Sequence, residues 1–428
     1  MTNRCCSNEP TDDASLPMRR RKWTTPSRCK TILALSVLLA LGSQADALEI
    51  GAPGDPFFLE MHGFVSQGLI VTTDNDYLAD DTTEGSLEYT EIGLNFTKPI
   101  TDNFRLGAQL VSQRIGPLGE FQLKVDWAYA DYRWKNWLGI RGGRMKVPFG
   151  LYNEVSDADS ARTPILLPQS IYPISNREFL LSQTGGEIYG YVDLATRGAL
   201  DYRLYAGKIF VDFPDQSTDA VRVDSLDIPY VFGGRLMWET PIEGLRVGGS
   251  LEYLRLDSDF VFDRSVYHPL QDAGLLPTSF DGRVSLEVPA LLWVTSVEYA
   301  LHDWVLSAEY SRWSTELKSS TPLLVPESES TSERAYVMAT YRVNDWFQPG
   351  VYYSILFPNV DDRSGRAGVQ HDLAATLRFD INQYLLVKFE GHYMNGTAGL
   401  SPGLNEGTPL SKLDGSWAVF LVKLTAHF

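Results

Sequence analysis

Short segments in which apolar and polar residues alternate constrain the fold more than any other feature of this chain. Residues 104–110, 245–253 and 385–390 each place apolar residues at every second position. Successive side chains of a β-strand point to opposite faces, so each segment predicts a strand with one apolar and one polar face. Segments of about ten residues with this alternation are typical of strands that meet lipid on one side and a polar interior on the other.

The part of the chain after residue 47 contains no apolar run long enough for a membrane helix. Its best candidate, residues 290–294, is only five residues long. A membrane-spanning helix needs about 20 apolar residues, and only helices and closed barrels satisfy every backbone polar group in lipid. The alternating segments therefore predict an all-β fold, a transmembrane antiparallel β-barrel.

The last residues of the sequence, 414–428, read DGSWAVFLVKLTAHF. Ala418, Phe420, Val422 and Leu424 fall on one face, and the segment ends at Phe428. An alternating terminal strand that ends in Phe resembles the sorting and assembly signal of bacterial outer-membrane barrels. The alternative is an ordinary edge strand that happens to end in Phe.

Residues 1–47 have the layout of a secretory signal peptide. Basic residues at 19–22 precede the apolar run 31–41, and Ala45 and Ala47 form a small-residue cleavage site. We expect this segment to be removed, although Met18 is an alternative start. The mature chain, residues 48–428, would then contain none of the three cysteines and no disulfide. Its predicted location is the outer membrane of a Gram-negative bacterium.

Short and long connections alternate between the predicted strands. Seven short and eight long connections join sixteen strands, and fourteen or eighteen strands are the alternatives. An even number places both termini on the side of the short turns. The short connections lie near residues 99–103, 134–136, 196–200, 240–244, 301–303, 343–345 and 380–383. The long connections lie at residues 74–86, 115–120, 148–183, 212–228, 258–289, 317–332, 358–368 and 397–413.

Aromatic residues gather at the predicted short turns, where amphipathic rings favour the membrane–water boundary. The residues predicted to form this girdle are Trp134, Trp137, Trp304, Tyr341, Trp346 and Phe347.

The longest connection, residues 148–183, is too apolar for a loop that stands free in water. We expect it to fold inward and narrow the lumen. Acids facing bases across such a constriction create a transverse field that favours polar solutes; alternatively, these charges lie outside, among lipopolysaccharide. The residues predicted to line the pore or its constriction are Arg144, Lys146, Glu154, Asp157, Asp159, Arg162, Arg177, Arg105, Lys124, Arg378 and Lys388.

Residues 143–153 (GRMKVPFGLYN) and 167–172 (LPQSIY) resemble a segment shared by many Gram-negative porin-like proteins, and more distantly the phosphate-selective porins O and P. The resemblance implies a passive channel in a homotrimer, with the third loop narrowing each pore. Phosphate-selective members line their pore with many Arg and Lys. Here Lys124 and Arg378 share the predicted inward positions with acids such as Glu252, so phosphate selectivity is not carried over.

Other kinds of chemistry find little support in the sequence. The formal net charge of −17 argues against nucleic acid as a partner, because phosphates need a basic footprint. The six His residues show no metal-ligand spacing, and the acidic residues of 74–84 favour a solvated loop over a Ca²⁺ site. We therefore predict no catalytic residue, metal or cofactor.

The predicted function is passive diffusion of small polar solutes or ions through a water-filled pore. The expected partners are outer-membrane lipid, lipopolysaccharide and two further copies of the chain. Three alternatives remain at this point: a substrate-specific channel, an outer-membrane lipase or protease barrel with a catalytic site around His371 or His392, and a secreted soluble β-protein.

Overall fold

The computed structural model of the protein describes residues 48–51, 58–176, 182–211, 218 and 220–428. The predicted signal peptide at residues 1–47 and one predicted pore residue, Arg177, lie outside the described residues. All described residues belong to one compact unit.

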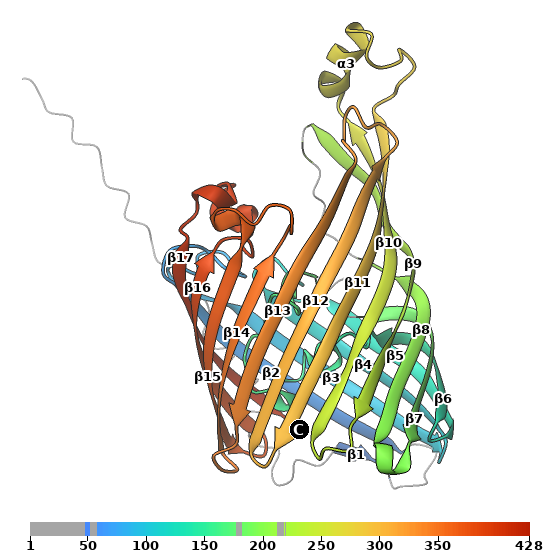
Figure 1. The fold of residues 1–428 in the computed structure, drawn as a ribbon, viewed down its shortest axis with the longest axis vertical. Coiled ribbons are helices and arrows are strands. Elements are labelled where there is room, and N and C mark those ends of the chain that lie inside the picture. The colour runs from blue at the N-terminus through green and yellow to red at the C-terminus, as the bar shows by residue number, and fades with distance from the viewer. Residues whose placement is uncertain (1–47, 52–57, 177–181, 212–217, 219) are drawn as a thin grey trace, which may run out of the picture. The chain divides into compact units, whose positions relative to one another are not determined.

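Sixteen strands, β2 to β17, form a closed antiparallel barrel (Figure 1), which confirms the predicted architecture. Each strand pairs with the next, and β17 pairs with β2 to close the ring. The strands are β2 (Leu59–Thr72), β3 (Ser86–Thr101), β4 (Phe104–Ile115), β5 (Leu123–Lys135), β6 (Leu138–Lys146), β7 (Ser182–Asp193), β8 (Ala199–Ile209), β9 (Val221–Glu239), β10 (Leu245–Phe262), β11 (Arg283–Leu301), β12 (Trp304–Ser319), β13 (Ser328–Tyr341), β14 (Phe347–Phe357), β15 (Gln370–Asn382), β16 (Leu385–Gly396) and β17 (Ser416–His427).

The two ends of the barrel sequence meet along one edge of β2. Phe428 exchanges backbone hydrogen bonds of 3.0 and 3.1 Å with Gly63. A further short strand, β1 (Leu48–Ile50), pairs with the first three residues of β2. The last residue of the sequence is thus part of the barrel ladder.

The helices of the described residues are short and lie in the connections. Helix α3 (Arg264–Asp272) begins after Asp263, whose side chain accepts a hydrogen bond from the backbone N–H of Ser265. Among the residues described, no helix is long and apolar enough to cross a membrane. The other helices of the described residues are the 3₁₀ helices η1 (Asn153–Val155), η2 (Asp159–Ala161), η3 (Ile174–Asn176), η4 (Ala195–Arg197), η5 (Arg366–Gly368), η6 (Pro402–Asn405) and η7 (Leu410–Lys412).

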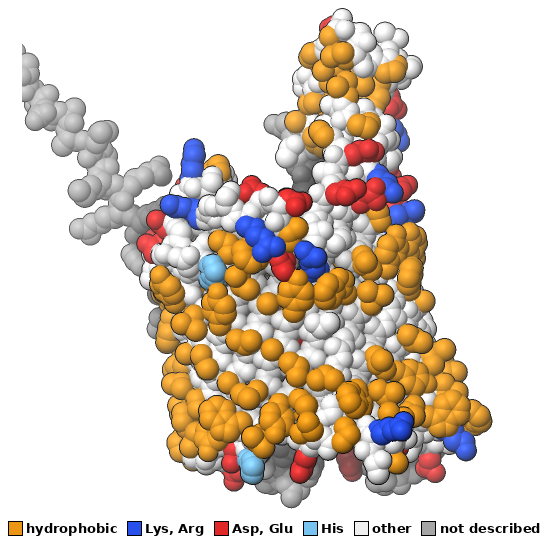
Figure 2. Space-filling model, in the orientation of Figure 1, with side chains coloured by type: hydrophobic (Ala, Val, Ile, Leu, Met, Phe, Trp, Pro, Cys, Tyr) orange, Lys and Arg blue, Asp and Glu red, His pale blue; other side chains and the backbone are white. Residues whose placement is uncertain are grey.

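The alternation of the strand sequences becomes an alternation of lipid-facing and lumen-facing side chains. In β17, Leu421, Lys423 and Thr425 are buried, whereas Phe420 is 48% exposed. Hydrophobic side chains cover the outside of the barrel in a broad belt (Figure 2). Apolar side chains remain on the outside because their solvent there is lipid, so the belt itself identifies the membrane-facing surface.

The two rims of the barrel differ in the way that the connection lengths predicted. Short turns lie at the lower rim with the C-terminus, and the long connections lie at the upper rim (Figure 1). Aromatic pairs mark the lower rim: Trp134 with Trp137, at 5.8 Å between ring centroids, and Trp304 with Tyr341, at 4.7 Å.

Three of the predicted long loops are partly strand, so their predicted bounds were too wide. Strand β9 takes residues 221–228 of the loop expected at 212–228, and β10 and β11 take 258–262 and 283–289 of the loop expected at 258–289. Strands β12 and β13 take 317–319 and 328–332 of the loop expected at 317–332. These strands project beyond the rest of the upper rim and carry α3 at their tip (Figure 1). The upper ends of β12 and β13 are mostly polar on both faces, so they lack the alternation that predicts a membrane strand. The upper end of β11 keeps it, since Val284, Leu286 and Val288 alternate with polar residues.

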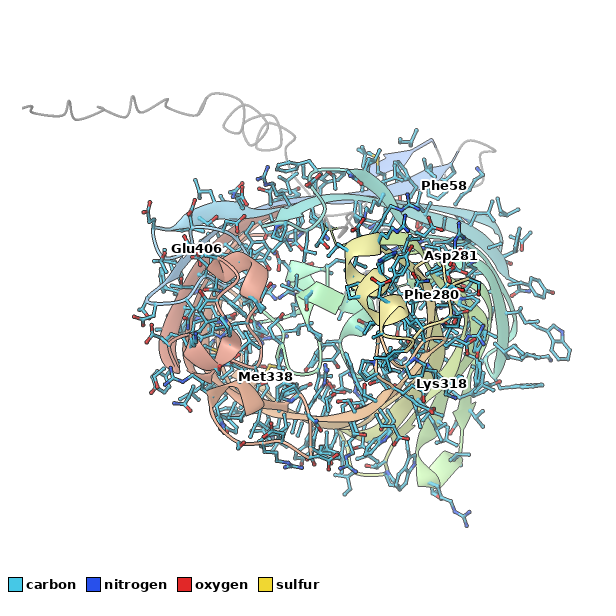
Figure 3. The ribbon with its side chains drawn as sticks, turned by 90° about the horizontal axis from the view of Figure 1, so that it is seen from above. Phe58, Phe280, Asp281, Lys318, Met338 and Glu406 are labelled. Carbon is cyan, nitrogen blue, oxygen red and sulfur yellow. The ribbon has the colours of Figure 1, made fainter. Side chains whose placement is uncertain are left out.

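The third connection contacts strands from all parts of the barrel wall. We name its described part, residues 147–176, the L3 segment. Its apolar side chains enter two separate clusters. One joins Phe149, Leu167 and Ile171 to wall residues of β8 to β15, and the other joins Ile165 and Leu166 to wall residues of β2, β3, β4, β16 and β17. Viewed from above, Glu406 and Phe280 mark two further loop assemblies over opposite sides of the ring (Figure 3).

Candidate functional site: the lumen constriction

The L3 segment is fixed to the β16–β17–β2 wall through Asp159. Its carboxylate lies 2.6 Å from the Lys423 ammonium and 2.9 Å from the Arg162 guanidinium. It also accepts hydrogen bonds from the hydroxyls of Thr425, at 2.8 Å, and Ser66, at 3.2 Å. All five side chains are buried, so one carboxylate joins the L3 segment to the strands at both ends of the barrel sequence.

Lys388 and Arg378 hold the same part of the L3 segment through backbone carbonyls. The Lys388 ammonium donates to the carbonyls of Asp159, Arg162 and Pro164 at 2.8, 2.7 and 3.3 Å. Arg378 donates to the carbonyls of Ser160 and Arg162 at 2.8 and 3.1 Å. These bonds satisfy carbonyl groups that a segment without helix or strand would otherwise leave unpaired inside the barrel.

Glu390 and Glu309 bind backbone N–H groups of the L3 segment on two different walls. Glu390, on β16, accepts from the N–H groups of Ile165 and Leu166 at 2.7 and 2.8 Å. Glu309, on β12, accepts from the N–H of Leu151 at 3.0 Å and from the hydroxyl of Tyr172. Two lumen carboxylates therefore replace the strand partners that this segment lacks.

Arginines from adjacent strands face the beginning of the L3 segment on a third wall. Glu154 pairs with Arg203 of β8 and with Arg235 of β9, the second contact being 2.8 Å. Arg141 of β6 pairs with Glu187 at 3.1 Å. The pairs Arg141–Asp131 and Arg246–Glu298 continue the same charged wall.

A polar cavity lies between this arginine wall and the L3 segment. Its volume is about 130 Å³, and it is lined by charged side chains of both signs together with backbone of the segment. The lining residues are Gly150, Leu151, Asp201, Arg235, Met237, Glu239 and Arg246. A small polar solute at this position would meet acids and bases on one surface.

A further ion pair connects the start of the L3 segment to β4, β5 and β6. Lys146 lies 3.3 Å from Asp126 and also pairs with Asp157. Gln109 donates to Asp126 at 2.8 Å, so the amide and the ammonium share one carboxylate. The L3 segment is therefore held by polar contacts to walls all around the ring, which places it within the ring.

Charged partners fix the ionisation of the acidic residues of the L3 segment. Burial alone would raise the pKa of Asp159, but Lys423 and Arg162 outweigh that effect and hold the pKa well below its usual range. Burial likewise opposes ionisation of Glu154, and Arg203 and Arg235 lower its pKa below the usual value. Both residues are thus carboxylates at neutral pH.

The structure gathers most of the predicted pore residues around the L3 segment but places others elsewhere. Lys146, Glu154, Asp157, Asp159, Arg162, Arg378 and Lys388 take part in the contacts described above. Arg144 donates to the backbone carbonyl of Asp126 at 3.1 Å, and Arg105 pairs with Asp131 near the lower rim at 2.8 Å. Lys124 is the second residue of β5, near the upper rim.

Some residues that hold the L3 segment were absent from the predicted site. Arg235, Glu309 and Glu390 contact the segment directly, and the predicted pore residues did not include them. The alternation of side chains along a strand could have identified them. Each lies an even number of residues from another buried side chain of its own strand and therefore on the same, lumen-facing side.

His392 is buried between two acids. Its Nδ1 lies 2.9 Å from Asp372 and its Nε2 lies 3.0 Å from Glu390. Both ring nitrogens are occupied by carboxylates, so neither is left to activate a hydroxyl, as a Ser–His–acid site requires. Within the part of the chain that the structure describes, no group of three or more His, Cys, Asp or Glu residues has the arrangement of a metal site.

The closed sixteen-stranded barrel, with its third connection held inside the ring, defines a porin-like outer-membrane fold. No protein-family model matches the chain, and no curated protein matches it. Solved structures do match. An anion-selective porin from Comamonas acidovorans aligns with a TM-score of 0.52 at 12% identity, covering 86% of this chain and 99% of that chain.

Two further structures are similar to the same extent. OmpF of Salmonella typhi, solved in a complex with daunomycin, aligns with a TM-score of 0.51 at 16% identity, covering 89% of this chain and 100% of that chain. OmpT, an outer-membrane protein of Vibrio cholerae, aligns with a TM-score of 0.50 at 12% identity, covering 91% and 99%. At these identities the likeness establishes the shared fold.

Proposed function

We propose that the protein is an outer-membrane porin through which small polar solutes or ions diffuse passively. The observation that carries this proposal is the set of polar anchors that holds the L3 segment within the ring, with Glu154 set against Arg203 and Arg235. Acids and bases facing each other across a narrowed lumen favour polar over apolar solutes, since only polar solutes exchange hydration for these contacts at low cost. The process needs no covalent step, cofactor or metal.

The proposal includes the setting in which such a channel works. Residues 1–47 direct export and are removed, the belt of apolar side chains contacts outer-membrane lipid, and the upper rim lies among lipopolysaccharide. Three copies assemble into a homotrimer in which each copy forms its own pore. The barrel fold, the aromatic lower rim and the resemblance of residues 143–153 and 167–172 to porin-like proteins support this setting.

The solute selectivity follows from the balance of lumen charges. The L3 segment and the walls carry both signs in close pairs, so neither strong anion nor strong cation selectivity is expected. Glu154 is the acid whose loss changes this balance most simply, because it neutralises two arginines beside the polar cavity. Glu154→Gln should therefore make the pore more anion-selective.

Single-channel recording in a planar bilayer under a salt gradient tests the proposal. The purified protein should give stable conductance steps, and Glu154→Gln should shift the reversal potential towards that of the anion. Asp224→Asn, on the upper part of β9, is the matched control and should leave the reversal potential unchanged. If preparations that still show a heat-modifiable barrel band on gels give no steps, the lumen is closed and the porin assignment fails.

A further inference from the structure

The outer wall of the barrel has a groove between β11 and β15 that is apolar throughout. Its volume is about 460 Å³, and it lies among exposed side chains that include Leu306, Val337, Val351 and Leu373. The groove exists because the small side chains of Ala308 and Ala339 stand among larger neighbours, including Tyr299 and Tyr353. An apolar hollow of this kind accommodates a hydrocarbon chain better than the convex wall around it.

A charged cluster lies on the same outer face, nearer the upper rim. Arg312 stands opposite Glu333 in the β12–β13 ladder. It faces outward because its neighbours along the strand, Ser311 and Trp313, are buried on the lumen side. Arg363, from the connection after β14, pairs with Glu333. Figure 2 shows charged side chains of both signs at the upper edge of the hydrophobic belt on this face.

This cluster has more positive than negative charge. Arg363 pairs with the carboxylate of Glu333, which also accepts a hydrogen bond from the hydroxyl of Tyr310, and Arg312 stands opposite Glu333 on the neighbouring strand. The Nε atom of Arg312 is buried and has no hydrogen-bond partner among the residues that the structure describes. Arg363 is held over the ring of Phe357, with 4.5 Å from its central carbon to the ring centroid. Two guanidinium groups and one carboxylate thus give these three residues a net positive charge towards an anion.

The distance between groove and cluster suits one amphipathic molecule. Ala308 and Arg312 are four residues apart on β12, about 13 Å along the strand. Arg312 is eight residues from Trp304 at the lower rim, about 27 Å along the strand and about 20 Å along the membrane normal for a strand tilt of about 40°. The apolar belt of such barrels is about 25 Å tall, so the cluster lies near its upper boundary.

We propose that this face of the barrel is a binding site for a phosphate-bearing acyl lipid of the leaflet on the long-loop side. One acyl chain occupies the groove at Ala308 and Ala339, and the phosphate accepts hydrogen bonds from Arg312 and Arg363. Guanidinium groups suit this role because they are weakly hydrated and match phosphate with two parallel donors. The site lies outside the lumen and does not depend on whether the pore conducts.

Native mass spectrometry of the detergent-solubilised protein tests the site with two matched probes. Dioleoyl phosphatidic acid carries both the chains and the phosphate, and dioleoylglycerol carries the same chains alone. We expect one phosphatidic acid to be retained at least tenfold more tightly than dioleoylglycerol. Inorganic phosphate, which has no chain, should not compete at millimolar concentration.

Two sets of variants separate the two halves of the site. Arg312→Gln with Arg363→Gln removes the guanidinium groups, and Ala308→Leu with Ala339→Leu fills the groove; each pair should weaken phosphatidic acid binding about tenfold. The control, Arg222→Gln with Arg283→Gln, removes two arginines whose side chains are 63% and 69% exposed on the projecting strands, and should bind like the wild type. A heat-modifiable band on gels confirms that each variant is folded.

Several results would overturn the proposal. These are equal binding of both probes, equal phosphatidic acid binding by all folded variants, and no retained lipid on the wild type. A fourth is efficient chain-to-chain crosslinking through Ala339→Cys in membranes, which would assign the groove to a second copy of the protein. Conductance measured on the same variants should be unchanged, so a failure of the lipid site is distinguishable from a failure of the porin assignment.

Discussion

The substitution Asp159→Asn should loosen the L3 segment more than any other conservative change in it. The asparagine keeps the shape of the side chain but removes the charge that Lys423 and Arg162 share. Lys423 would keep Glu91, and Arg162 would keep only backbone carbonyls. Breaking a buried ion pair costs about 3–5 kcal/mol. Because Lys423 retains one acid, we expect a loss of about 3 kcal/mol, or roughly a hundredfold in the equilibrium between attached and detached segment.

Two measurements test this predicted loss of stability. Urea unfolding of the barrel in lipid vesicles should show a free energy of unfolding lower by about 3 kcal/mol. Single-channel records should show more frequent current fluctuations, because a detached L3 segment moves within the lumen. The matched control is Asp227→Asn, whose carboxylate pairs with Lys208 at 2.9 Å while the two side chains remain 46% and 39% exposed. An exposed pair contributes about 0–1 kcal/mol, so this variant should resemble the wild type.

The reasoning is refuted if Asp159→Asn unfolds at the same urea concentration as Asp227→Asn and its open-channel current is equally quiet. That outcome would mean that the carbonyl contacts of Lys388 and Arg378 suffice to hold the segment. The double variant Asp159→Asn with Lys388→Met would then show whether those contacts act in its place.

Two further predictions concern the same segment. The carboxylate of Asp159 has a depressed pKa, so it contributes stability above its unfolded pKa of about 4 and loses that contribution as the pH falls through the lower folded value. The difference in unfolding free energy between wild type and Asp159→Asn should therefore be constant from pH 7 to about 4 and shrink in stronger acid; growth of the difference on acidification would contradict the assigned direction. Phe149 is buried against Trp313, with 6.4 Å between ring centroids. Its replacement by Ala should lower the unfolding free energy by about 3–5 kcal/mol in the same urea titration. A loss under 1 kcal/mol would show that its cluster does not support the barrel.

The barrel could be predicted because each membrane strand carries its own signal. In β17, Phe420, on the face predicted to be apolar, is exposed, whereas Leu421, Lys423 and Thr425 of the other face are buried. The projecting ends of β12 and β13 could not be predicted in this way, because their residues are mostly polar on both faces and lose the period of two. Helix α3 lies between β10 and β11, and its position depends on those strands.

The sequence predicted that the L3 segment forms the site, but not which wall residues it contacts. Asp159 binds Ser66, Lys423 and Thr425, which lie at opposite ends of the sequence and meet only when the ring closes. On β6, Arg141 and Lys146 both reach lumen acids although they are an odd number of residues apart.

A glycine with an unusual backbone conformation lies between these two side chains. Gly143 has a φ of 133°, a conformation that side-chain-bearing residues rarely adopt. Counting every second residue therefore does not predict which side chains of β6 face the lumen.

The junction of β17 with β2 has a consequence for how the chain reaches its native state. The hydroxyls of Thr425 and Ser66, 2.9 Å apart, are separated by 359 residues of sequence. Pairings this distant form late, since the entropy of closing the intervening chain must be overcome first. Until then both strands present unpaired edges, which are templates for aggregation. We therefore expect ring closure to be a slow step of folding, during which both edges are exposed, and a factor that assists assembly to act by shielding those two edges.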